Sequence, residues 1–234
     1  MNILALTAHP DDAEGRCGGT LLKYRKAGHK IFIALTTSGN IGSNTHESRE
    51  EIARVREAEE LEAAKILGAE VRFMRFDDEG LQDTPETRRA VLSAIRWANP
   101  DVVFTNAPWD TSTDHGMTGK LVSEVILSLP GKLVPADEPP ITKTPSVFFW
   151  DPPAGIDFNP EVYVDITEEM DEKLKAMACH KSQYAWTGES HFHDFMDHNK
   201  IIDMFRGLQN GCRYAESFVP LRTHGFMPDF KLLP

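Results

Sequence analysis

Short apolar runs alternate with longer amphipathic segments over the first 150 residues of the chain. The short runs have the composition of buried strands, and the longer segments have the apolar spacing of helices. The predicted strands are Ile3–Thr7, Lys30–Thr36, Val71–Phe76, Asp101–Asn106 and Ser146–Trp150. The helices predicted between them are Gly19–Ala27, Glu47–Leu67, Pro85 to about Ala98, and Gly116–Leu129.

Glycine and proline mark several of these boundaries. Gly28 and Gly68 follow the first two helices, in the position that ends a helix most readily. Thr84 before Pro85 is a typical capping residue followed by a proline at the first helical position. The segment Lys132–Thr144 contains three prolines and is expected to be a loop rather than a linker between domains.

The pattern becomes less regular after Trp150. It predicts a strand at Val162–Ile166 and helices at Glu168–Gln183 and Met196–Gln209, the first helix with Met170, Leu174 and Met177 in the core. Strands that alternate with helices favour a parallel sheet with right-handed crossovers. The sequence therefore predicts one domain over residues 1–234, a Rossmann-like α/β fold with helices on both faces of a mostly parallel sheet and a C-terminal elaboration.

Composition excludes several classes of protein. The 25 Lys and Arg against 36 Asp and Glu give a formal net charge of −11, which argues against a nucleic-acid partner. The three widely spaced cysteines make no disulfide framework and favour a reducing compartment. The N-terminus does not read as a signal peptide, and no run approaches the roughly 20 apolar residues of a membrane helix. A cytoplasmic protein without a membrane partner is expected.

Polar side chains gather after four of the predicted strands. In an open α/β sheet, ligands bind beyond the carboxyl ends of the strands, so these loops should share one crevice. So many carboxylates in one place are costly unless a cation accompanies them. The residues concerned are His9, Asp11, Asp12 and Glu14; Ser38–Gly42; Asp77–Glu79; and Trp109, Asp110, Asp114 and His115.

The densest of these loops reads Ala-His-Pro-Asp-Asp-Ala-Glu over residues 8–14. One histidine and one carboxylate from it, with His115, would make a two-histidine, one-carboxylate set that suits Zn²⁺ or Fe²⁺ with open positions. Asp11 could then act as a base on water whose pKa the metal lowers from about 16 towards roughly 7. The alternative is that His9 and Asp12 only cap the following helix while His115 lies on a surface loop.

The AHPDDAE motif at the end of the first strand resembles the LmbE-like, or PIG-L-type, family of zinc-dependent N-acetylglucosaminyl de-N-acetylases. The resemblance continues in register over most of the chain. The loop at Thr36–Gly42 is similar to the family's T-x-G-x-x-G, and the helix from Arg56 to Gly68 is similar to its R-x-x-E-x-x-x-A-A-x-x-L-G. The other matching segments are Gly18–Leu21, Ala27–His29, Val164–Thr167, Lys173, His180–Gln183 and Tyr214–Phe218.

This resemblance implies hydrolysis of an N-acyl group, usually acetyl, on a small amino-sugar-like substrate. Carried over by residue, His9, Asp12 and His115 are the ligands of Zn²⁺, with Fe²⁺ as the alternative metal. Asp11 is the catalytic base and then the acid that protonates the leaving amine. The family also implies a homo-oligomer.

One position departs from the family pattern. The second motif commonly reads H-P-D-H, whereas this chain has Ser112-Thr113-Asp114-His115, so Ser112 stands where a histidine faces the developing oxyanion. Losing one such donor typically lowers the rate by about 10²–10³. Three explanations stay open: zinc alone suffices, another histidine replaces the donor, or the enzyme is slow or specialised. His193, or His191, is the predicted catalytic replacement, and a solvated histidine loop is the alternative.

Arg56, Asp78 and Ser112 are predicted to bind substrate. Arg56 could instead pair with Glu59 on its helix, and Asp78 could simply form the turn before Gly80.

Two further carboxylates, Asp110 and Asp114, flank His115 and are expected to orient a ligand imidazole. His180 is expected to pack against its helix or cap its end.

Other functions stay open. A sugar- or nucleotide-binding module could use the same crevice without turnover, and Ser112 favours that reading. A metal-dependent phosphoesterase would be expected to carry a second carboxylate-rich metal site. The glycines do not form the G-x-G-x-x-G of a dinucleotide dehydrogenase.

Overall fold

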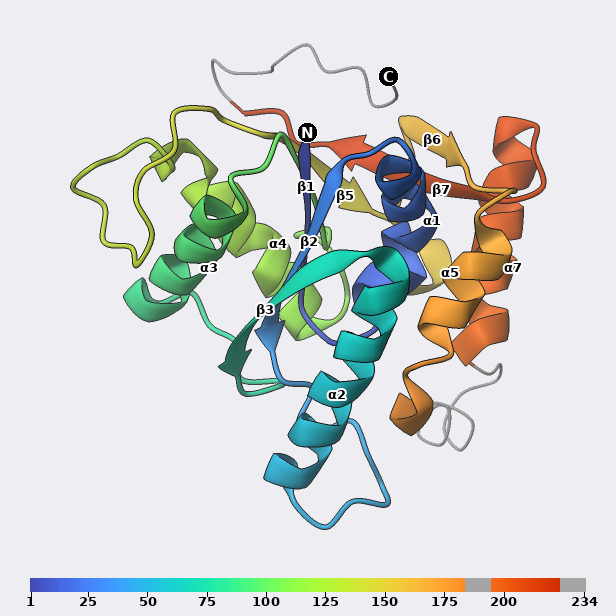
Figure 1. The fold of residues 1–234 in the computed structure, drawn as a ribbon, viewed down its shortest axis with the longest axis horizontal. Coiled ribbons are helices and arrows are strands. Elements are labelled where there is room, and N and C mark those ends of the chain that lie inside the picture. The colour runs from blue at the N-terminus through green and yellow to red at the C-terminus, as the bar shows by residue number, and fades with distance from the viewer. Residues whose placement is uncertain (184–194, 224–234) are drawn as a thin grey trace.

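A computed structural model describes residues 1–183 and 195–223 of the chain. They form a seven-stranded sheet with the strand order β3-β2-β1-β4-β5-β7-β6 (Figure 1). The strands are β1 (Asn2–Thr7), β2 (Lys30–Thr37), β3 (Ala69–Phe76), β4 (Val102–Thr105), β5 (Ser146–Trp150), β6 (Val162–Asp165) and β7 (Ala215–Pro220).

The first five strands are parallel, which confirms the predicted α/β class. In the register of the sheet, Ile3 of β1 lies between Ile31 of β2 and Val102 of β4. The chain adds β2 and β3 on one side of β1, and β4 and β5 on the other. The strand order therefore reverses between β1 and β4, which is where such sheets bind ligands. Strand β7 runs antiparallel to both β5 and β6 and was not among the predicted strands.

Helices cover both faces of the sheet, as predicted (Figure 1). Helices α1, α2 and α5 pack on one face, α3 and α4 pack on the other, and α7 lies against β7 and β6. In the part of the chain that the structure describes, none has the length and apolarity needed to cross a bilayer. Their bounds are α1 (Asp12–Lys26), α2 (Arg49–Leu67), α3 (Pro85–Ala98), α4 (Thr113–Val125), α5 (Met170–Met177) and α7 (Phe195–Asn210), with short 3-10 turns at Ile126–Ser128 and Pro153–Gly155.

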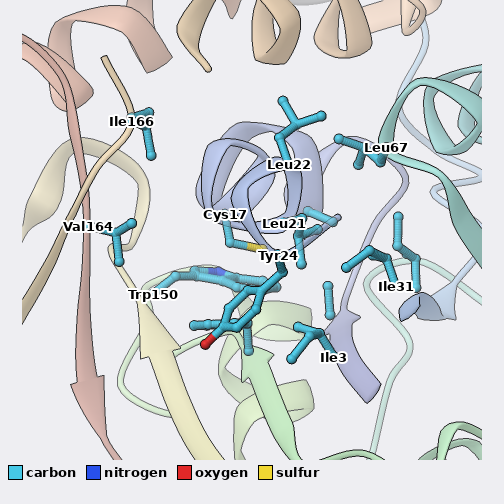
Figure 2. Close-up of a cluster of buried hydrophobic side chains, with 14 of the residues drawn as sticks. Ile3, Cys17, Leu21, Leu22, Tyr24, Ile31, Leu67, Trp150, Val164 and Ile166 are labelled. Atoms are coloured by element: carbon cyan, nitrogen blue, oxygen red, sulfur yellow. The ribbon is translucent and has the colours of Figure 1, made fainter. Parts of the chain in front are cut away.

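The core consists of two hydrophobic layers separated by the sheet. Alternate residues of β1 enter opposite layers, so Ile3 packs with α1 and Leu4 packs with α3 and α4. A central parallel strand is covered on both faces, which is why its sequence is an unbroken apolar run. Figure 2 shows Leu21 and Tyr24 of α1 packed over the sheet near Trp150.

Helix α1 begins at Asp12, so the prediction that it starts at Gly19 was wrong. The paired glycines at 18 and 19 look like helix breakers in the sequence, but they serve close packing. A Cβ on Gly19 would lie 2.6 Å from Cγ2 of Ile166, which leaves no room for a side chain between α1 and the end of β6. The packing contact overrides the low helix propensity of glycine.

Two other helices differ from their predicted bounds by three residues or more at one end or both. Helix α4 runs from Thr113 to Val125 rather than from Gly116 to Leu129, and a 3-10 turn continues it. Helix α5 ends at Met177 instead of reaching Gln183. The chain turns there because the backbone N–H of His180 bonds the carbonyl of Met177, and the His180 side chain is completely buried.

A buried ion cluster joins the C-terminal elements to α1. Nζ of Lys173 in α5 lies 2.7 Å from Oδ2 of Asp203 in α7 and 2.9 Å from Oε1 of Glu216 in β7. Glu216 also accepts hydrogen bonds from the backbone N–H groups of Gly19 and Thr20. Each charge in this cluster therefore has a partner within the chain, and four elements are held together by it.

Candidate metal centre

The predicted ligands are placed by β1, β4 and the starts of two helices. His9 follows β1, Asp12 is the first residue of α1, and His115 lies in the first turn of α4 after β4. Because β1 and β4 are neighbours, these helix starts meet at the point where the strand order reverses.

The three side chains converge on a common centre. Nδ1 of His9 lies 3.1 Å from Nε2 of His115, which lies 3.3 Å from Oδ1 of Asp12. Oδ2 of Asp12 lies 3.8 Å from Nδ1 of His9 and accepts hydrogen bonds from the backbone N–H of His9 and from Oγ1 of Thr7. The predicted ligand set is therefore brought together with its donor atoms facing inward.

The outer nitrogen of each imidazole faces a carboxylate. Nε2 of His9 lies 2.8 Å from Oδ1 of Asp78 and 3.3 Å from Oδ2 of Asp114. Nδ1 of His115 lies 2.9 Å from Oδ2 of Asp110. A carboxylate on the outer nitrogen fixes the tautomer and leaves the inner nitrogen free to bind a metal. The residues present thus fit a divalent ion such as Zn²⁺ or Fe²⁺.

Two of these carboxylates, Asp78 and Asp114, face the imidazole of His9. Asp114 faces His9 rather than His115 and also accepts hydrogen bonds from the backbone N–H groups of Glu79 and Leu81. Asp78, predicted to take substrate, lines the pocket, but one of its oxygens faces His9. The turn before Gly80 is closed by the carbonyl of Asp77, not by the Asp78 side chain.

Buried carboxylates set the electrostatics of the centre. Burial alone would lower the pKa of His9, but hydrogen bonds to Asp114 and Asp78 and the charge of Asp12 raise it to about 9. For His115, burial is likewise outweighed, chiefly by the charge of Asp12, and its pKa rises to about 10. Burial opposes ionisation of Asp12, yet the two histidines hold its pKa well below the usual range. The surroundings strongly favour positive charge at this point.

Asp11 lies beside this set in an unusual backbone conformation. It precedes α1 with φ 103° and ψ −25°, in the left-handed region that residues other than glycine rarely adopt. Its Oδ2 lies 3.1 Å from Nη2 of Arg56. Burial raises the pKa of the Asp11 carboxyl, and the charge of Arg56 offsets part of that rise.

Arg56 does not pair with Glu59 but contacts the loops that follow β1 and β2. Its guanidinium donates to the carbonyl oxygens of Pro10 and Gly39 at 2.6 and 3.1 Å, in addition to its contact with Asp11. Glu59 instead accepts hydrogen bonds from the backbone and side chain of Ser182. Arg56 is almost fully buried but lines the edge of the pocket.

The centre opens into a pocket of about 640 Å³. Ser112 lies in its wall just before α4, with its backbone N–H bonded to Oδ1 of Asp110. His191 and His193 lie outside the described residues. Residues of the pocket wall that the sequence did not point to include Arg16, Thr111 and Pro153.

A second cluster of ionisable groups, Glu14, Glu60 and His180, was missed as a unit. All three side chains are completely buried, with Nε2 of His180 3.5 Å from Oε2 of Glu14 and 4.0 Å from Oε2 of Glu60. Burial opposes protonation of His180, but Glu14 and Glu60 raise its pKa to about 9. Burial and Glu14 raise the pKa of Glu60 well above its usual range. His180 packs inside, as one reading of the sequence expected.

The fold and the centre define an α/β protein whose two-histidine, one-aspartate group at the switch point of the sheet could hold a metal ion. The family model described as PIG-L, GlcNAc-PI de-N-acetylase, matches residues 4–126, more than half of the chain. The chain belongs to this LmbE-like family, as the sequence motifs indicated.

Individual relatives agree in extent and in fold. The chain is 30% identical over 231 residues to the diacetylchitobiose deacetylase of Thermococcus kodakarensis, covering 93% of this chain and 83% of that protein. The inhibitor complex of the N,N'-diacetylchitobiose deacetylase from Pyrococcus horikoshii superposes with a TM-score of 0.82 at 28% identity, covering 94% and 83%. A 4-oxalmesaconate hydratase of Pseudomonas putida is 25% identical over 190 residues, covering 77% and 73%.

Proposed function

We propose that this protein is a metal-dependent amidohydrolase that removes the acetyl group from a small N-acetyl amino sugar, with diacetylchitobiose-like compounds as the first candidates. The observation that carries the proposal is the arrangement of His9, Asp12 and His115, whose donor atoms meet at one point at the edge of a 640 Å³ pocket. Pockets of this size are typical for small-molecule substrates. Membership of the family and the deacetylases among its relatives support the same reaction.

His9, Asp12 and His115 would hold the metal ion. When bound, such an ion supplies Lewis acidity that polarises an amide carbonyl and makes water a better nucleophile near neutral pH. Asp110 keeps His115 in the tautomer that binding requires, and Asp78 and Asp114 do the same for His9.

Asp11 would move the proton. Arg56 occupies its Oδ2, so Oδ1 is the atom that takes a proton from the attacking water. The raised pKa of Asp11 suits this role, because a base with a higher pKa accepts the proton more readily. The protonated carboxyl then donates to the amine, which must be protonated in order to leave.

The test combines metal analysis with product detection. Purified wild type should contain about one divalent ion per chain and release amine from some member of an N-acetyl sugar panel. Asp12→Ala should lose both, whereas Glu62→Gln, an exposed change on α2, should lose neither. Bound metal without amine release would favour the binding module. A carefully prepared wild type that binds no added divalent ion would contradict the proposal.

Hydration of an unsaturated acid is the second candidate function. It is favoured by the relative named 4-oxalmesaconate hydratase, which matches more than three quarters of the chain. The same centre would activate water for addition to a double bond instead of an amide. Including 4-oxalmesaconate in the panel and following its ultraviolet absorbance separates the two reactions.

A further inference from the structure

The buried cluster Glu14, Glu60 and His180 lies next to Asp11, which Glu60 contacts, and outside the lining of the pocket. None of the three side chains lines the pocket, so none can touch a bound substrate. Oε2 of Glu60 nevertheless lies 3.4 Å from the backbone nitrogen of Asp11, which donates to it. The cluster is therefore connected to the proposed base through the main chain.

We propose that Glu60 is a positioning residue that holds Asp11 in its reactive orientation, and that Glu14 and His180 keep the Glu60 carboxylate in place. This inference rests on the proposed function, because it concerns the base of that reaction.

The first argument is the strain at Asp11. A non-glycine residue in the left-handed region costs on the order of 1–3 kcal/mol and persists only where its surroundings enforce it. With φ at 103°, the Asp11 backbone needs such enforcement. No side-chain hydrogen bond of Asp11 to the start of α1 provides it. The restraint must come from another element.

Helix α2 provides that restraint through hydrogen bonds to both polar groups of one peptide unit. Arg56 donates to the carbonyl oxygen of Pro10, and Glu60 accepts from the N–H of Asp11. These two atoms belong to the same peptide bond, between Pro10 and Asp11. Arg56 and Glu60 are four residues apart and so lie on one face of α2. Holding both the C=O and the N–H fixes the plane of that peptide and hence the direction of the Asp11 side chain.

The second argument is the state of the cluster itself. Within the described part of the chain, Oε1 of Glu60, both carboxylate oxygens of Glu14 and both ring nitrogens of His180 are buried without a hydrogen-bond partner. Buried polar groups are rarely left unpaired, since each costs about 1–3 kcal/mol. The imidazole between the two carboxylates supplies the positive charge that makes their burial tolerable. Such an arrangement is costly for stability alone, and holding Asp11 gives it a function.

The same donor types and spacings would also suit a second metal ion, because their ligand atoms lie within 4.8 Å of one another. Positioning is preferred because one oxygen of Glu60 is engaged by Asp11. Metal content distinguishes the two readings.

The test is a double-mutant cycle between Glu60→Met and Asp11→Asn, with Glu62→Met as the matched control on an exposed turn of α2. Glu60→Met should lower kcat about 10–100-fold with KM unchanged, since a misplacement of about 1 Å can cost 10²-fold. Glu60→Gln retains an acceptor and should recover most of the rate. In the Asp11→Asn background, Glu60→Met should cause little further loss, because the group it positions is already gone.

Two readouts do not depend on turnover. Metal content should stay at one ion per chain in Glu60→Met, and hydrogen exchange at the Asp11 amide should become faster by at least 10-fold. If Glu60→Met fails to fold, hydrogen exchange at the Asp11 amide is measured on Glu60→Gln instead. Protection close to that of wild type supports the role of Glu60 in holding Asp11. Exchange as fast as at an exposed loop amide overturns it.

Each contrary outcome has a distinct meaning. An equal loss from Glu60→Met in both backgrounds would show a general structural role and overturn the inference. Two ions per wild-type chain, with one lost in Glu60→Met, would replace it with a second metal site. Full rate in Glu60→Met together with an inactive Asp11→Asn overturns only this inference, whereas full activity in Asp11→Asn overturns the proposed function as well.

Discussion

Two buried groups of charges in this protein solve the same physical problem differently. In the C-terminal part, Lys173 lies between Asp203 and Glu216, and backbone N–H groups of α1 donate to both oxygens of Glu216. At the switch point of the sheet, carboxylates surround two imidazoles whose inner nitrogens face one another at 3.1 Å.

The difference shows how a structural ion cluster can be told from a candidate site. In the Lys173 cluster a buried cation of the chain itself lies between the two carboxylates. The His9 and His115 group has an excess of carboxylate, has donor atoms that converge within 4.8 Å of one another, and opens into a pocket. Buried charge is thus informative about function when the chain does not supply its partner.

The largest expected effect comes from breaking the structural cluster. Lys173→Met leaves two buried carboxylates without their cation, and we expect a loss of about 3–5 kcal/mol in the free energy of unfolding. Urea denaturation measures this, with the exposed Lys175→Met on the same helix as the control. kcat per folded molecule should not change. A loss below about 1 kcal/mol, as for a surface ion pair, would contradict a structural role for the Lys173 cluster.

Added metal should stabilise the protein through the His9, Asp12 and His115 group and not through the Lys173 cluster. At a free concentration of 100 times its dissociation constant, Zn²⁺ should stabilise the wild type by about 2.7 kcal/mol. Thermal unfolding at several zinc concentrations gives this value. Asp12→Asn should show no such increment, whereas Lys173→Met should retain it in full. A zinc effect that disappears in Lys173→Met would mean that the two regions are coupled.

Asp110 tests how strongly the carboxylates on the outer imidazole nitrogens affect metal affinity. Asp110→Asn removes the negative charge from the outer nitrogen of His115, and we expect metal affinity to fall about 10–100-fold. Competition with a fluorescent chelator measures the affinity. The exposed Asp171→Asn should leave it unchanged. An unaltered affinity in Asp110→Asn would show that the tautomer of His115 is fixed by other means.

The smallest effect is a pH dependence within the structural cluster. Burial and the neighbouring Glu216 raise the pKa of Asp203 to about 7, although Lys173 opposes the rise. The folded state therefore holds this proton more tightly than the unfolded state, so its contribution to stability falls as pH rises from about 4 to 7.

In Asp203→Asn that fall is absent. The stability of the variant relative to wild type should increase by roughly 1 kcal/mol per pH unit between pH 5 and 6.5. Urea denaturation at several pH values, with Asp171→Asn as the reference, measures it. A constant difference would show that Asp203 is ionised throughout this range.

Much of the fold could be predicted from the apolar pattern because β1, β2, β4 and β5 are almost continuous buried runs, and because α2 and α3 begin at the capping residues Ser48 and Thr84. Strand β7 was missed because its short segment, Ala215–Pro220, mixes apolar and polar residues and is a strand only through pairing with β5 and β6. The start of α1 was missed because tertiary packing at Gly19 outweighs local propensity.

The candidate site also has residues that the sequence predicts and residues that it does not. His9 and His115 could be found because metal-binding residue types lie in the loops after neighbouring strands, and Asp12 was singled out from the other carboxylates of its loop by the resemblance to the family. The cluster of Glu14, Glu60 and His180 could not, because acidic residues on a helix usually face solvent and their partner is more than 100 residues away in the sequence. The role of His193 and the homo-oligomer implied by the family stay predictions.

The antiparallel strand β7 has a consequence for synthesis of the protein. It is inserted between β5 and β6, so β6 has no partner in the sheet until β7 is present. A growing chain therefore carries β5 as an open edge while about 70 more residues are added, which takes roughly 4–14 s at 5–20 residues per second. During that interval the apolar β5 is free to pair with another chain. The ribosome-bound protein therefore keeps an apolar open edge until late in translation.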